Sequence, residues 1–100
     1  MKVYGLRFGK HALRQWKQLD IAIRKQFTRK LEKVVHHPRI VSGRMHGYPD
    51  AYRLKLRKSG FRLAYRVFDD EVVVVVISVG NRDKNKIYDD FALYYHEGEL

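Results

Sequence analysis

Residues 52–67, YRLKLRKSGFRLAYRV, decide the fold more than any other stretch of the chain. Apolar side chains alternate with basic ones on both sides of a short segment that contains Gly60. Two alternating runs joined in this way are typical of a β-hairpin. With the apolar residues on one face and the turn at 58–61, we expect Leu56 to lie opposite Leu63.

The other face of this predicted hairpin is basic. Its five cations are Arg53, Lys55, Arg57, Arg62 and Arg66. In the expected register Arg57 faces Arg62 and Arg53 faces Arg66, and like charges in such positions cost up to about 1 kcal/mol per pair. A bound polyanion would relieve that repulsion, whereas the alternative is a solvated outer face screened by salt. The prediction is an exposed basic face that binds a polyanion.

The remaining patterns complete a β-α-α-β-β-β-α order. Alternation, helical spacing of apolar residues and a nearly continuous apolar run predict the elements. They are expected at residues 2–8, 10–19, 20–35, 52–57, 62–67, 72–79 and 84–95. We therefore predict a single α+β domain over residues 1–100. It has an N-terminal strand, a helical hairpin on one sheet face, an antiparallel three-strand meander and a short C-terminal helix.

Charge and composition indicate which class of partner the protein binds. The 100 residues carry 21 Lys and Arg against 11 Asp and Glu, a net charge of +10. This excess favours nucleic acid, with an acidic protein or plain solubility as the alternatives. The chain has no cysteine, its start lacks the apolar region of a signal peptide, and its longest apolar run, Val72–Ile77, is too short for a membrane span. We expect a cytoplasmic protein that needs no membrane.

The titratable residues predict neither a metal nor a cofactor. No two of the five histidines are spaced at i, i+4 on a predicted helix, and carboxylates cluster only at 69–71 and 89–90. Phosphate-binding and dinucleotide fingerprints are absent from the sequence. Arg82 and Tyr88 follow the last strand, and we expect both to join the basic face. A cluster of cations can bind phosphate, and a tyrosine beside it can stack on a base.

Two segments make the chain recognisable. Residues 47–67 resemble the central hairpin of RelE toxins, and residues 74–82, followed by Tyr88, resemble the strand and arginine after it. The helix around Trp16 and the segment Pro38-Arg39-Ile40 also match, so the likeness covers essentially the whole chain.

This resemblance implies a toxin of a type II toxin–antitoxin system. Such a toxin is a metal-independent endoribonuclease that enters the ribosomal A site and cuts messenger RNA by attack of a ribose 2′-OH. The catalytic residues implied here are Lys55, Arg62, Arg82 and Tyr88. Arg62 and Arg82 would bind phosphate oxygens, Lys55 would share a proton, and Tyr88 would stack a base or act as general base. The family has a lysine where this chain has Arg53, which can bind phosphate but cannot relay a proton.

The partners follow from the same resemblance. They are messenger RNA on the ribosome, with its 16S rRNA, and a cognate acidic antitoxin that covers the basic site and involves the C-terminal segment. Operator DNA is expected only through the antitoxin complex. We expect Arg53, Arg57 and Arg66 to contact RNA. Two other functions fit the sequence. One is a ParE-like toxin that poisons DNA gyrase, and the other is a non-catalytic RNA-binding module that would be indifferent to Tyr88.

Overall fold

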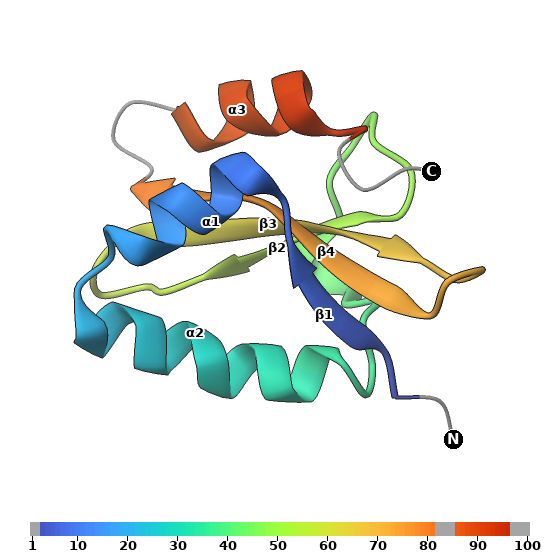
Figure 1. Cartoon of the computed structure of the whole chain (residues 1–100), viewed down its shortest axis with the longest axis horizontal. Helices are drawn as coiled ribbons and strands as arrows, with labels where there is room; N and C mark the ends of the chain where they lie inside the picture. The colour runs from blue at the N-terminus through green and yellow to red at the C-terminus, as the bar shows by residue number, and fades with distance from the viewer. Residues whose placement is uncertain (1–2, 82–85, 97–100) are drawn as a thin grey trace.

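A computed structural model describes residues 3–81 and 86–96. Its elements are three α-helices, one short 3-10 turn and four strands (Figure 1). In chain order they are β1 (Gly5–Phe8), α1 (Lys10–Lys17), α2 (Ile21–Val34), η1 (Val41–Gly43), β2 (Ala51–Lys55), β3 (Phe61–Phe68), β4 (Val73–Asn81) and α3 (Lys86–Tyr94). The predicted element order and the α+β fold class are confirmed.

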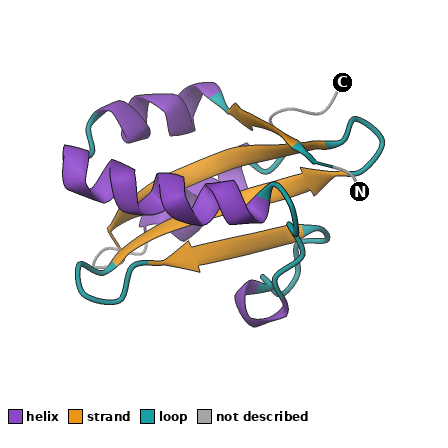
Figure 2. Ribbon diagram, turned by 90° about the horizontal axis from the view of Figure 1, so that it is seen from below, coloured by secondary structure: helices purple, strands orange, loops and turns teal. Residues whose placement is uncertain are grey.

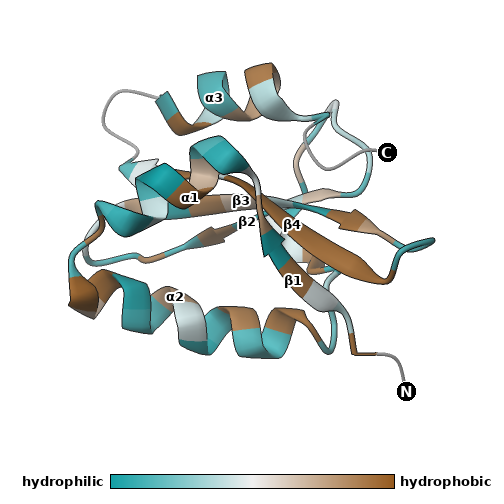
Figure 3. Cartoon of the chain, viewed as in Figure 1, coloured by the Kyte–Doolittle hydropathy of each residue, from teal (hydrophilic) through white to brown (hydrophobic). Residues whose placement is uncertain are grey.

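The strands form one sheet in the order β1-β4-β3-β2. β2, β3 and β4 make the predicted antiparallel meander, and β1 pairs parallel with β4. β4 is central and its residues Val73–Val79 are buried, which explains why that run lacks alternation (Figure 3).

The helices cover the sheet on two sides. α2 lies across one face of the sheet (Figures 1 and 2). Its Phe27 and Leu31 pack in a core cluster with Leu63 and Tyr65 from the apolar face of the hairpin. Trp16 of α1 lies against this cluster, with its ring centroid 6.4 Å from that of Phe27. The apolar alternation therefore predicted the correct face of the sheet.

The sequence suggested that the opposite face of the sheet is exposed. Instead, α3 packs on it (Figure 1). Phe91 of α3 is fully buried in a second core cluster with Ala51, Ala64 and Ile77. Two of these sheet residues are alanines on the basic face of the hairpin, and their small side chains leave room for the helix. The basic face is consequently divided into a covered part and an open part.

The predicted hairpin register is wrong by two residues. Leu54 pairs with Leu63, Lys55 with Arg62 and Arg53 with Ala64. The loop is 57–60, not 58–61, because the Gly60 N–H donates to the Leu56 carbonyl oxygen at 2.9 Å with Gly60 at φ +77°. An even shift keeps every side chain on its predicted face. It also removes both expected Arg–Arg pairs, and the like-charged pair that remains is Lys55 opposite Arg62.

Candidate functional site

The site is centred on the hydroxyl of Tyr88, in the first turn of α3. This oxygen accepts a hydrogen bond from Arg62 Nη1 at 3.2 Å and another from Arg53 Nη1 at 3.4 Å. The three residues come from α3, β3 and β2, so the fold brings together side chains that are 26 and 35 positions apart in sequence. Two guanidinium groups thus converge on one oxygen.

These guanidinium groups have unused hydrogen-bonding capacity. The Nε atoms of Arg53 and Arg62 are buried, and neither has an acceptor among residues 3–81 and 86–96. A guanidinium presents five N–H donors in a planar fork that matches the oxygens of a phosphate. Buried donors left unpaired cost free energy, so the pair is suited to an incoming anion.

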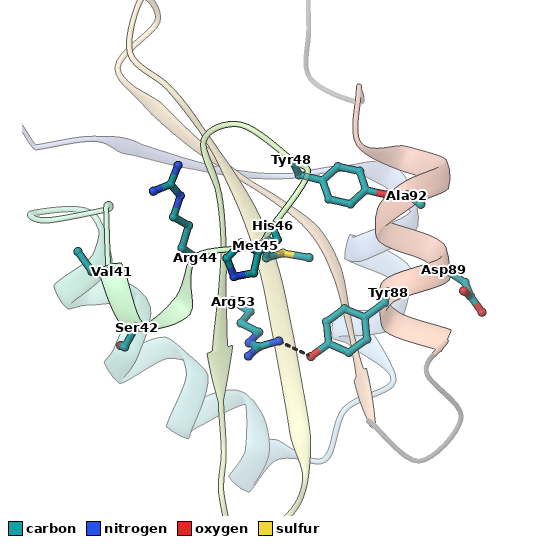
Figure 4. Close-up of a pocket in the computed structure, with 10 residues that line it drawn as sticks. All are labelled: Val41, Ser42, Arg44, Met45, His46, Tyr48, Arg53, Tyr88, Asp89 and Ala92. Carbon is teal, nitrogen blue, oxygen red and sulfur yellow. Dashed lines mark hydrogen bonds between the residues drawn. The ribbon is translucent and has the colours of Figure 1, made fainter.

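A groove of about 670 Å³ runs beside these side chains (Figure 4). It lies between α3 and the segment that leads into β2. Its lining residues are Val41, Ser42, Arg44, Met45, His46, Tyr48, Arg53, Tyr88, Asp89 and Ala92. Arg53 and Tyr88 belong both to the arginine site and to the groove lining, so the groove brings a cation and an aromatic ring together, as binding of a nucleic acid strand requires.

The other four predicted site residues are each placed differently. Lys55 is exposed and lies directly opposite Arg62 in the sheet, so it borders the arginine pair. Arg57 is exposed on the hairpin loop. Arg66 packs its guanidinium carbon 4.1 Å from the Tyr95 ring centroid and donates to the Tyr95 carbonyl oxygen at 3.1 Å. It therefore secures the chain after α3. Arg82 lies outside the described residues.

Polar contacts hold α3, and with it Tyr88, in place. Gln15 of α1 donates to Asp90 Oδ2 at 3.0 Å and accepts from the Val79 N–H at 3.0 Å. His11 Nε2 also lies 3.0 Å from Asp90 Oδ2, although its N–H is not aligned as a hydrogen bond. The His11 ring stacks on Tyr94 with a centroid separation of 4.4 Å. The buried carboxylate of Asp90 therefore ties α3 to α1, and Gln15 in turn links α1 to β4.

A second set of contacts fixes the segment that forms the other wall of the groove. The Met45 N–H donates to the Ala51 carbonyl oxygen at 3.0 Å, and Met45 is buried. Tyr48 packs against Phe91 with centroids 5.1 Å apart. A Cβ on Gly43 would overlap the carbonyl oxygen of Arg53, so this turn lies directly against the β2 backbone.

One arginine in the segment between α2 and η1 links that segment to the sheet. Arg39 forms ion pairs with Asp50 at 2.6 Å and Asp69 at 2.5 Å. Its hydrogen bond to the Tyr52 hydroxyl and these carboxylates raise its pKa above the ordinary arginine value. Tyr65 donates to the Pro38 carbonyl oxygen at 2.6 Å, and burial raises its pKa above the ordinary tyrosine value.

Sequence reasoning missed two residues of this site. Gly43 lies in the short η1 turn, which carries no motif, and its contact with the β2 backbone demands the absence of a side chain. His46 carries no motif that a sequence could reveal, because it lies in an irregular segment and reaches the groove only through the fold.

In the part of the chain that the structure describes, no group of three or more His, Cys, Asp or Glu side chains is arranged to hold a metal ion. Over the same residues, no helix combines the length and apolar character needed to cross a membrane.

Comparison with known proteins gives a consistent result. A family model described as the ParE toxin of the type II toxin–antitoxin system parDE matches residues 6–86. The mRNA interferase toxin RelE of Escherichia coli K12 is 45% identical over 87 residues, which are 87% of this chain and 92% of RelE. A putative RelE-like toxin protein of Escherichia coli is 42% identical over 85% of this chain and 90% of its own.

Solved structures agree with these sequence relatives. A double-arginine variant of E. coli RelE in the free state superposes with a TM-score of 0.85 at 42% identity, covering 91% of this chain and 96% of that one. A RelE chain from the intact E. coli RelBE toxin–antitoxin complex gives a TM-score of 0.78 at 46% identity, covering 80% and 98%.

Proposed function

This chain belongs to the RelE/ParE family of type II toxins, and from that membership we propose that it is a ribosome-dependent endoribonuclease that cuts messenger RNA in the ribosomal A site. The observation that carries the proposal is the convergence of Arg53 and Arg62 on the Tyr88 hydroxyl. The similarity to RelE, which is named an mRNA interferase, indicates the substrate class.

The Tyr88 hydroxyl marks where an anionic oxygen can bind. It is the shared acceptor of two guanidinium groups whose Nε donors have no acceptor of their own in the described chain. A phosphodiester offers two non-bridging oxygens and full negative charge, so it is a better acceptor for this pair than a neutral phenol. The arrangement is preorganised for phosphate before substrate arrives.

The proposed reaction is attack of a ribose 2′-OH on the adjacent phosphorus. The O2′–P bond forms, the P–O5′ bond breaks, and the products are a 2′,3′-cyclic phosphate and a free 5′-OH. Negative charge grows on the non-bridging oxygens, where Arg62 and Arg53 would stabilise it, with Arg82 as a third cation. Lys55, beside Arg62, would supply a proton to the leaving 5′ oxygen. Tyr88 would keep the two guanidinium groups positioned and offer its ring to a base.

The ribosome would supply the substrate geometry. Arginine, lysine and tyrosine are weak acid–base catalysts at neutral pH. The cleavage rate would therefore depend strongly on correct positioning of the 2′-OH and the phosphorus. Messenger RNA held in the A site is already ordered, whereas free RNA is not. We therefore expect cleavage of free RNA to be slow compared with cleavage on the ribosome.

The antitoxin is the second proposed partner. Relatives have been solved as complexes with the antitoxin RelB. With a net charge of +10 and a basic groove, this chain is suited to an acidic antitoxin that covers the site. Such a complex would reach operator DNA through the antitoxin. The whole cycle would take place in the cytoplasm.

The test is cleavage of a defined message by the purified protein, with and without ribosomes. The expected result is one cut inside the A-site codon, a cyclic phosphate at the 3′ end and a 5′-OH on the downstream fragment, the products of 2′-OH attack. Inhibition of gyrase without any cleavage would favour the ParE-like alternative. RNA binding without cleavage, unaffected by Tyr88→Phe, would favour the non-catalytic module.

A further inference from the structure

Gln15 of α1 is hydrogen-bonded to two elements that border the proposed site. Its amide nitrogen donates to Asp90 Oδ2 of α3 at 3.0 Å, and its amide oxygen accepts from the Val79 N–H of β4 at 3.0 Å. The side chain is half-buried and lies one helical turn after Ala12, which is fully buried in the core. Both ends of the amide are therefore satisfied, as a half-buried polar group requires.

On the β4 side, the Gln15 amide takes the place of a neighbouring strand. The pairing of β1 with β4 stops at Phe8, although β4 continues beyond that point. The Val79 N–H lies on the edge that β1 leaves open, is buried, and is bonded to the Gln15 oxygen instead. The next residue, Gly80, is paired with Arg62 of β3. Gln15 therefore fixes the part of β4 that lies beside Arg62.

On the α3 side, Gln15 provides one of two hydrogen-bonded anchors on either side of Tyr88 in the sequence. The fully buried Ser78 hydroxyl of β4 donates to the Ile87 carbonyl oxygen at 2.9 Å. Gln15 holds Asp90, one turn further along the same face of the helix. Tyr88 points from α3 toward the arginine pair (Figure 4). A helix with one anchor can pivot, whereas two anchors fix its rotation.

The orientation of α3 matters because the Tyr88 hydroxyl is at the end of a long side chain. Its hydrogen bonds from Arg62 and Arg53 are 3.2 Å and 3.4 Å long, near the upper limit for such bonds. A displacement of about 1 Å would break them, and a misplacement of that size in an active site can lower a rate by about 10²-fold. The position of Tyr88 is therefore sensitive to small rotations of the helix.

We infer that Gln15 is a positioning residue for RNA cleavage, an inference that rests on the proposed endoribonuclease function. Through Asp90 and Val79 it holds the helix that carries Tyr88 against the strands that carry Arg62. Gln15 is not among the described residues that line the groove, so it acts through these elements and does not touch the substrate. Its contribution belongs to the rate of the bound enzyme. Ribosome binding depends instead on exposed cations.

An exchange of donor and acceptor tests this inference. Gln15→Glu keeps an oxygen for the Val79 N–H but places a second carboxylate beside Asp90 Oδ2, where the amide donor stood. The two carboxylates repel each other, so this contact opens. Asp90→Asn in the same chain restores the bond with reversed polarity, because the new amide donates to the new carboxylate. Gln26→Glu, at an exposed position of α2, is the charge-matched control.

The measurement is single-turnover cleavage of a message on purified ribosomes over a range of protein concentrations. It separates the saturating rate from the concentration that gives half saturation. We expect Gln15→Glu to lower the saturating rate by about 10-fold to 10²-fold. Its half-saturation concentration should equal that of Gln26→Glu. The double variant, Gln15→Glu with Asp90→Asn, should recover most of the wild-type rate.

Two further variants separate positioning from a general loss of structure. In a Tyr88→Ala background, Gln15→Glu should lower the rate much less than it does in the wild type, because the side chain that it displaces is already absent. Gln15→Met is uncharged and similar in length, and it removes both hydrogen bonds. It should lower the saturating rate as Gln15→Glu does, and it serves in place of Gln15→Glu if that variant does not fold. Far-UV circular dichroism at the assay temperature establishes which variants are folded.

Saturating rates of Gln15→Glu and Gln15→Met equal to that of Gln26→Glu would overturn the inference. An equal loss in the Tyr88→Ala background would also overturn it, as would a folded double variant that recovers nothing. Each of these results leaves cleavage by the wild type intact, so the proposed function would stand. If the wild type cuts nothing on ribosomes, the proposed function fails, and this inference fails with it.

Discussion

Replacement of Asp90 by alanine should loosen α3 and displace Tyr88. Asp90 is buried, accepts a hydrogen bond from Gln15 at 3.0 Å and lies 3.0 Å from His11 Nε2. Tyr88 stands two residues before it on the same helix. The contacts of this one carboxylate therefore hold α3, a wall of the groove, in place. Their loss should lower both the free energy of unfolding and the cleavage rate.

The size of the effect can be worked out from these contacts. Asp90→Ala leaves the Gln15 amide without its acceptor in a half-buried site, which costs about 1–3 kcal/mol. Alanine has the higher helix propensity, which returns about 0.5 kcal/mol. The net loss in the free energy of unfolding is then about 0.5–2.5 kcal/mol, a fall of about 2–20 °C in Tm for a domain of this size.

Asp90→Asn is the matched control. Both contacts reach the same oxygen, Oδ2, and an amide oxygen can replace it there. Because Asp90→Asn removes only the charge, it should lower the free energy of unfolding by less than about 1 kcal/mol. Urea denaturation gives the stability, and ribosome-dependent cleavage gives the catalytic effect at a temperature where both variants are folded. Equal stability and equal cleavage rates for the alanine variant and the wild type would refute the reasoning.

Three further predictions concern other parts of the fold. Gly43→Ala should lower both Tm and the cleavage rate, since the new Cβ overlaps the Arg53 carbonyl oxygen; an unchanged Tm would contradict this close packing. Burial raises the Tyr65 pKa, so the stability that this group contributes is complete below the unfolded value of about 10 and is lost as the pH rises above it. Denaturation curves measured against pH should therefore show a smaller alkaline loss for Tyr65→Phe than for the wild type. Binding to programmed ribosomes should weaken steeply with added salt, because the net charge is +10; salt-independent binding in a filter assay would argue against phosphate contacts.

Side-chain alternation predicted the faces of the hairpin but not its register. A shift by an even number of residues leaves each side chain on the same face of the sheet. The sequence therefore predicted the correct face for Tyr52, Leu54 and Leu63. The register depends on which residues of the loop take the turn conformation. Gly60 occupies the last loop position, with positive φ, and a pattern of apolar residues contains no record of that choice.

The covered half of the basic face could not be foreseen from composition. Ala51 and Ala64 read as neutral positions among arginines, whereas in the fold they admit α3 against the sheet. The same helix supplies Tyr88, whose approach to the arginines was expected. His46 reached the groove through an irregular segment, and only tertiary contacts define its place.

The central claim is that the arginine pair under Tyr88 cleaves messenger RNA on the ribosome. The most direct measurement is toeprinting of a defined message on purified ribosomes with wild type, Arg62→Ala and Arg29→Ala, a charge-matched control on the exposed side of α2. The account predicts a new message end in the A-site codon for wild type and Arg29→Ala, reduced about 10²-fold or more in Arg62→Ala. Undiminished cleavage by a folded Arg62→Ala, or none by the wild type, would contradict it.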